Sequence, residues 1–188
     1  MMADEKTPFQ TLSSRIDWEC NWYRVRRDEI ALPDGKEATY NVVEMRDSAF
    51  ILPVTSEGKI VLIRNYRYAL KSWIWEIPAG GIQTGETAQE AAERELREEI
   101  GGRSYNWQFL LKAATMNGIG NHHSHFFLAR DVVLSEAQHE ETEAMTIHPM
   151  SVKDALNLAK SGEMNDALSI CAILLAEPYL PKVRRKAP

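Results

Sequence analysis

Three glutamates that are close together in the sequence are candidates for binding a metal cation. Glu95, Glu98 and Glu99 fall within a sector of about 100° if residues 87–100 form a helix, because successive helical residues are ~100° apart. Three alanines share that face: Ala88, Ala91 and Ala92. Small side chains leave room for another group to approach the helix, and carboxylate oxygens are ligands that Mg²⁺ prefers. The pattern therefore indicates a binding surface, with a plain solvated acidic face as the alternative.

The helix that would carry these glutamates has clear start and stop signals. Thr87 and Glu90 have the spacing of a capping box, in which each side chain accepts a hydrogen bond from the other residue's backbone amide. Gly101 and Gly102 follow the last helical residue, and glycine tolerates the left-handed geometry of a helix end. The sequence therefore predicts a helix over 87–100.

Segments rich in β-favouring residues flank this helix on both sides. They cover 18–25, 39–45, 49–54, 60–63 and 73–77 before it, and 108–113, 124–129 and 145–148 after it. A turn at 33–35 joins the first two segments into an N-terminal hairpin, and a turn at 56–59 joins the next two. Two further helices are predicted over 152–161 and 165–177. This order of elements predicts a mixed sheet with helices packed on its faces.

Composition excludes several classes of protein. The chain of 188 residues has the size of one compact domain, and its net charge of -5 argues against a general nucleic-acid binder. Two cysteines are too few for a disulfide framework or a zinc site. The N-terminus lacks a secretory signal, and no apolar run approaches the ~18 residues that a membrane span needs. We therefore expect a cytoplasmic protein with neither a nucleic-acid nor a membrane partner.

The spacing around the glutamates resembles the Nudix box. Five residues separate Gly80 from Glu86, and seven more lead to the run from Arg94 to Gly102. The box has a glycine, a glutamate, an arginine–glutamate pair, an aliphatic residue, a glutamate pair and a glycine at these separations. Gly102 departs from it, because the box ends on an aliphatic residue. The resemblance implies an α/β Nudix fold, an α/β/α sandwich with a mixed sheet, to which we add N-terminal antiparallel strands.

The same resemblance implies a metal site for the hydrolysis of a diphosphate bond. Mg²⁺ is the expected cofactor, with Mn²⁺ as the alternative ion. Glu95 and Glu99 would be its principal ligands, Ala79 would contribute its backbone carbonyl, and Glu98 would be a further ligand or act through water. Two other box residues complete this set of catalytic roles: Arg94 would orient the carboxylates, and Glu86 would brace the turn into the helix.

Other segments are similar to the ADP-ribose pyrophosphatase branch of that family. These segments are 65–67, 75–80 and 162–167, and the similarity covers roughly 15–177. In that branch an acidic loop after the box supplies a catalytic base and one more metal ligand. The loop here contains Glu140, Glu141 and Glu143. Its register favours Glu141 as the base and Glu143 as the ligand, with a slip of one residue, or a loop that never reaches the site, as alternatives.

The substrate pocket is less well specified by the sequence. Trp18 and Trp22 are aromatic side chains that can stack on a nucleobase, and Arg64 or Arg67 can hold phosphate. The other candidate substrate-binding residues are Glu76, Gly80, Gly118 and His122. The branch has a proline before the glycine that corresponds to Gly118, and a glutamate near the next strand. This chain has Asn117 and His122 at those two positions. Those departures question ADP-ribose itself and leave the class of nucleoside diphosphate sugars intact.

The expected domain organisation follows from these assignments. We expect an N-terminal strand element over 1–46 for dimerisation and for the substrate pocket, a Nudix hydrolase domain over 47–180 and a flexible tail over 181–188. The homodimer rests on the resemblance alone. The expected activity is Mg-dependent hydrolysis of a nucleoside diphosphate sugar or ADP-ribose to a nucleoside monophosphate and a sugar phosphate. The alternatives are a nucleotide-binding sensor without catalysis and a hydrolase of another diphosphate, such as a dinucleoside polyphosphate.

Overall fold

The computed structural model describes residues 7–135 and 144–181, and these form two compact units. The first, here called the N-terminal unit, contains the described residues up to Asp47 together with Ala114–His123. The second, here called the α/β unit, contains Ser48–Ala113 and the described residues from Ser124 onward. None of the helices in the described ranges is long and apolar enough to cross a membrane.

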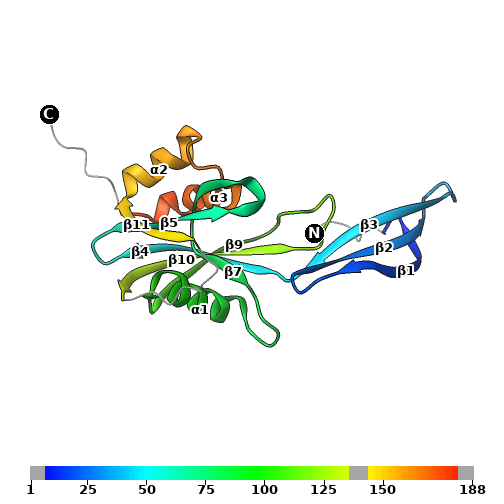
Figure 1. Cartoon of the computed structure of the whole chain (residues 1–188), viewed down its shortest axis with the longest axis horizontal. Helices are drawn as coiled ribbons and strands as arrows, with labels where there is room; N and C mark the ends of the chain where they lie inside the picture. The colour runs from blue at the N-terminus through cyan, green and yellow to red at the C-terminus, as the bar shows by residue number, and fades with distance from the viewer. Residues whose placement is uncertain (1–6, 136–143, 182–188) are drawn as a thin grey trace. The chain divides into compact units, whose positions relative to one another are not determined.

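The N-terminal unit is built on an antiparallel sheet with the strand order β1-β2-β3 (Figure 1). The strands are β1 (Gln10–Glu19), β2 (Tyr23–Ala31) and β3 (Glu37–Met45). The prediction of one strand over 18–25 is wrong, because the chain turns between β1 and β2 and the Cys20 amide donates to the Tyr23 carbonyl at 3.0 Å. Aromatic residues on both sides of this turn produced an unbroken β-favouring segment. The first strand was missed because all ten of its residues are exposed and most are polar.

The α/β unit contains a mixed eight-stranded sheet and three α-helices. Its strands are β4 (Ser48–Thr55), β5 (Lys59–Arg67), β6 (Ser72–Glu76), β7 (Ala79–Gly81), β8 (Gly102–Arg103), β9 (Asn106–Ala114), β10 (His123–Leu134) and β11 (Met145–Ser151). Its helices are α1 (Ala88–Ile100), α2 (Val152–Ser161) and α3 (Ala167–Ala176), with short 3₁₀ turns at Tyr68–Leu70 and Glu177–Tyr179. The main path runs β11-β5-β4-β10-β8, and β4 and β10 are parallel whereas β5 is antiparallel to its neighbours.

Two apolar layers hold the helices to the sheet. Alternate side chains of β5 point to opposite faces. Ile60 and Leu62 pack with α2 and α3, while Val61 and Ile63 pack with α1. Figure 1 shows α1 on one side of this sheet and α2 and α3 on the other. The predicted α/β/α sandwich with a mixed sheet and N-terminal antiparallel strands is confirmed.

Side-chain caps define where the three helices begin. The predicted capping box of α1 is present, because the Thr87 hydroxyl accepts from the Glu90 amide and the Glu90 carboxylate accepts from the Thr87 amide. Ser151 caps α2, and Asp166 caps α3, which therefore starts later than the predicted residue 165. The buried Ser169 hydroxyl accepts a hydrogen bond from the Ile77 amide at 2.9 Å. This bond ties α3 to the segment that leads from β6 into β7.

Candidate active site

The glutamate face of α1 lies close to the sheet because small residues line the contact. Ala91 and Ala92 are fully buried in the core layer that α1 shares with β4 and β5. The space that these alanines leave is therefore filled by the sheet and not by a ligand. Gly80 in β7 permits the same close approach, because a Cβ atom at this position would overlap the Glu95 carboxylate. The absent side chain of Gly80 thus lets the Glu95 carboxylate reach the backbone of β7.

Arg94 gathers the carboxylates of the candidate site around one guanidinium group. Its Nε and Nη2 atoms donate to the two carboxylate oxygens of Glu86 at 2.9 and 3.1 Å. Its Nη1 atom donates to Glu95 at 2.6 Å and to Glu98 at 3.0 Å. Nη2 also donates to the Gly81 carbonyl at 2.9 Å. One side chain therefore connects the turn before α1, the strand β7 and two glutamates of the helix.

The charges in this network stabilise one another. Hydrogen bonds to Glu86 raise the pKa of Arg94, and the same hydrogen bonds lower the pKa of Glu86. Glu86 also accepts a hydrogen bond from the Gln83 amide at 2.9 Å, so its carboxylate is held from two sides. Glu86 lies at the turn before α1 and Arg94 contacts the carboxylates, while the roles expected of the two residues stay predictions. The sequence did not reveal the contacts of the Gly81 carbonyl and the Gln83 amide, because almost every residue has these backbone groups whatever its side chain.

Glu99 is the most buried carboxylate of the helix. Its residue is 8% exposed, and its Oε2 atom accepts a hydrogen bond from the Ala79 amide at 3.0 Å. The predicted ligand Glu99 and the backbone of the predicted ligand Ala79 are therefore in contact. This contact also fixes the C-terminal turn of α1 against the start of β7.

The donor set fits a small hard cation with few protein ligands. Within the described ranges, no three histidine, cysteine or acidic side chains form a preassembled metal-binding group. Mg²⁺ does not require one, since it usually keeps several waters and binds through one or two carboxylates together with substrate phosphate. Glu95 and Glu99, one turn apart beside the Ala79 backbone, provide this kind of donor set.

Arg67 and Glu76 form a second charged pair on the α1 side of the sheet. Arg67 donates from Nε and Nη2 to the two oxygens of the buried Glu76 carboxylate at 2.8 and 2.7 Å. These bonds raise the pKa of Arg67, with smaller contributions from the charges of Glu99 and Asp166. Two predicted substrate-binding residues are thus paired with each other, close enough to Glu99 for its charge to act on Arg67. Asp166 was not predicted as a site residue, because the sequence places it only within the segment 162–167.

Arg64 lies on the other face of the sheet from this pair. Strand residues alternate between faces, so Arg64 points away from the side that Ile63 shares with α1. Its guanidinium carbon is 5.0 Å from the centre of the Trp75 ring, and that ring contacts His148 edge-on. The structure therefore does not bring Arg64 to the glutamates, and of the two candidate arginines Arg67 is the one beside them.

Six other predicted site residues belong to the N-terminal unit or lie outside the described residues. In the N-terminal unit, Trp18 packs on Tyr23 with ring centres 5.2 Å apart, and Trp22 is 81% exposed. Also in this unit, the Gly118 carbonyl accepts from a tyrosine hydroxyl at 2.9 Å, and buried His122 bonds the hydroxyl of Thr115 at 2.7 Å. The predicted base and ligand, Glu141 and Glu143, lie outside the described residues together with Glu140.

Comparison with known proteins connects this geometry to a family. Residues 44–170 match the model of the NUDIX domain, and residues 9–43 match that of the nucleoside diphosphate sugar hydrolase N-terminal domain. The chain is similar to an ADP-ribose pyrophosphatase of Mycobacterium tuberculosis, with 32% identity over 88% of this chain and 82% of the relative. It is also similar to an ADP-ribose pyrophosphatase of Bacillus subtilis, with 33% identity over 78% of this chain and 80% of the relative.

A solved structure described as an ADP compounds hydrolase has the same fold. It superimposes with a TM-score of 0.81, covers 94% of this chain and 96% of its own, and is 20% identical in sequence. The family model covers the strand β7, the turn at Glu86 and the whole of α1, which are the elements that hold the Arg94 network. The chain therefore belongs to the Nudix hydrolase family.

Proposed function

We propose that this protein hydrolyses the diphosphate bond of a nucleoside diphosphate sugar or of ADP-ribose, giving a nucleoside monophosphate and a sugar phosphate. The observation that carries the proposal is the Arg94 network, in which one guanidinium holds Glu86, Glu95 and Glu98 while Glu99 is fixed to the Ala79 amide. A merely solvated acidic helix has no reason to organise its carboxylates in this way. Their arrangement suits a cation that neutralises phosphate charge.

The residues of the site divide the work in this proposal. Glu95, Glu99 and the Ala79 carbonyl hold Mg²⁺, with Mn²⁺ as the alternative ion, and Glu98 and Glu143 complete the set of ligands. When bound by these residues, the ion would supply positive charge to the diphosphate oxygens and would make water easier to deprotonate. Glu141 accepts the proton of the attacking water. Arg94 and Glu86 are positioning residues, because they act through the carboxylates that they hold.

Three observations support a nucleoside diphosphate derivative as the substrate. Both curated relatives described above are named ADP-ribose pyrophosphatases, and the solved neighbour is named an ADP compounds hydrolase. Arg67 lies beside the glutamates, where its guanidinium can turn from Glu76 to a phosphate oxygen. The exposed Trp18 and Trp22 supply rings for stacking on the base. Asn117 and His122, which depart from the ADP-ribose branch, question ADP-ribose itself and leave the class of nucleoside diphosphate sugars intact.

The N-terminal unit serves a homodimer in this proposal. Its three-stranded sheet exposes a series of large apolar and aromatic side chains: Phe9, Leu12, Ile16, Trp18, Trp22, Tyr23 and Tyr40. Exposed large apolar side chains in this number suit a protein interface. A second copy of the chain is the partner that we propose for it, with the N-terminal strands completing the partner's substrate pocket.

The activity is tested by a panel of nucleoside diphosphate sugars, ADP-ribose and dinucleoside polyphosphates, each incubated with and without Mg²⁺. We expect Mg²⁺-dependent release of a nucleoside monophosphate from at least one compound. Glu99→Gln should lower kcat/KM on that compound by roughly 10²-fold or more, because it removes a charge from the metal site. Glu57→Gln is the control, since Glu57 is an exposed glutamate in the turn between β4 and β5 of the same unit. Tight binding of one compound without turnover of any would favour the sensor instead.

The proposed base is tested on the same substrate. Glu141→Gln should leave substrate and metal binding intact and slow the chemical step by ~10² to 10⁴-fold, the usual effect of losing a general base. Single-turnover rates and Mg²⁺ titrations separate these two effects. If Glu141→Gln reacts at the wild-type rate and Glu140→Gln reacts slowly, the base is Glu140 and the proposed register is wrong by one residue. If neither change slows the reaction, Glu98 becomes the next candidate.

The dimer is tested by light scattering of the purified chain, whose subunit mass is 21.4 kDa. We expect about twice that mass, and Ile16→Glu in the exposed face of β1 should shift the protein toward the monomer, because a buried unpaired charge is costly. Thr11→Glu is the control, because it adds the same charge to β1 at a residue that is not one of the exposed apolar side chains. A monomeric wild-type protein would contradict the proposed dimer and the shared pocket.

A further inference from the structure

A hollow lies on the back of α1, away from the glutamates that form the candidate active site. Its volume is about 320 Å³, and it is lined by α1, by β8 and by the loop that follows β8. Glu93 and Arg97, which line it, point about 150–170° away from the middle of the sector that holds Glu95, Glu98 and Glu99, given ~100° per residue. Nothing in the proposed hydrolysis uses this surface.

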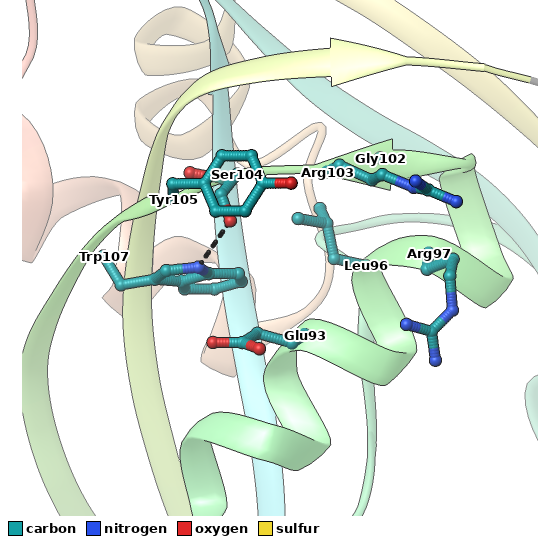
Figure 2. Close-up of a pocket in the computed structure, with 8 residues that line it drawn as sticks. All are labelled: Glu93, Leu96, Arg97, Gly102, Arg103, Ser104, Tyr105 and Trp107. Carbon is teal, nitrogen blue, oxygen red and sulfur yellow. Dashed lines mark hydrogen bonds between the residues drawn. The ribbon is translucent and has the colours of Figure 1, made fainter.

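One end of the hollow is aromatic. Figure 2 shows Tyr105 and Trp107 at this end, and Tyr105 is 99% exposed. The Trp107 ring is fixed in place, because its Nε1 atom donates to the Ser104 carbonyl at 3.0 Å and its edge packs on Phe127. Because the Tyr105 ring is fully exposed, it adds no buried apolar surface to the core of this protein. The pair provides two ring surfaces for a planar ligand.

The other end of the hollow is cationic. Arg97 and Arg103 lie there in Figure 2, on the last turn of α1 and on the strand β8. Both are exposed, and neither guanidinium has an ion-pair or hydrogen-bond partner within the residues that the structure describes. Two uncompensated guanidinium groups that line the same hollow favour an anion such as phosphate.

The backbone beneath these side chains is already ordered. The Asn106 amide donates to the Ser104 hydroxyl at 3.0 Å, and the Asn106 side chain donates to Asp131 at 2.9 Å. Gly102 lies at the base of the hollow against Leu96, where a Cβ atom would come within 2.9 Å of the leucine side chain. A preformed site loses less conformational entropy when its ligand binds.

We infer that this hollow is a second nucleotide site, which binds a compound that carries both a planar ring and a phosphate, such as a nucleoside monophosphate. The ring lies against Tyr105 and Trp107, and the phosphate lies between Arg97 and Arg103. Glu93 stands near the aromatic end in Figure 2, where its carboxylate can accept from an amino or hydroxyl group of the ligand. The volume is at the lower end of the ~300–1,000 Å³ typical of ligand pockets, which suits a mononucleotide.

Calorimetric titration of the metal-free protein with AMP tests this inference, with adenosine and inorganic phosphate as partial ligands. We expect one AMP site whose affinity falls by roughly tenfold or more in Arg97→Ala and in Arg103→Ala, as for a lost charge-assisted hydrogen bond. Lys153→Ala is the control, because it removes an exposed positive charge from α2 in the same unit. Any AMP bound at the glutamate face would be retained in all three variants.

Variants of Tyr105 distinguish a nucleotide site from a site that binds only an anion. Its ring is fully exposed, so Tyr105→Ala leaves the fold intact and tests the site even if the arginine variants fold poorly. We expect Tyr105→Ala to weaken AMP several-fold and to leave phosphate binding unchanged, while Tyr105→Phe keeps the wild-type affinity. Identical AMP titrations for wild type, Arg97→Ala and Arg103→Ala would overturn the inference. Equal affinities for AMP and phosphate, with no effect of Tyr105→Ala, would also overturn it.

Discussion

The structure of the candidate active site depends on the pairing of one arginine with several carboxylates that repel one another. Glutamates one turn apart repel each other, at a cost of ~0.2 to 0.5 kcal/mol on an exposed helix and more where water is excluded. The Arg94 guanidinium offsets this repulsion for Glu86, Glu95 and Glu98, and its planar fork also fixes where their oxygens lie. Lysine has the charge but not the geometry to make these contacts at the same time.

The fold provides the short distances that this pairing requires. Alanines on α1 and the bare backbone of Gly80 let the helix approach β7 closely enough for Glu95 and Glu99 to meet it. The strand β7 is held by its ladder with β4, and the Ile51 amide donates to the Pro78 carbonyl at 2.9 Å just before it. On the opposite face, the bond between Ser169 and Ile77 anchors the same segment to α3. Both helical layers therefore determine where the carboxylates lie.

Much of this arrangement could be predicted from the sequence, because it depends on local signals. The capping box at Thr87, the glycine end of α1 and the box spacing identify the helix and its set of charged residues. Two kinds of feature could not be predicted. The strand β5 extends to Arg67, beyond the predicted 60–63, and it is buried on both faces, so its composition does not reveal which of Arg64 and Arg67 faces α1. The turn after β1 is flanked by aromatic residues, which conceal it within a β-favouring run.

The central claim is that Arg94 positions the carboxylates for a cation and does more than neutralise them. Titration of Mg²⁺ into the wild type, Arg94→Met and Arg97→Met tests it directly, since both variants lose one positive charge from the same helix. Simple electrostatics predicts tighter Mg²⁺ binding in Arg94→Met, because a repulsive cation has been removed. The positioning role predicts the opposite sign: weaker binding in Arg94→Met, and binding in Arg97→Met that is as tight as in the wild type or slightly tighter. Unchanged or tighter Mg²⁺ binding in Arg94→Met would contradict this account of the site.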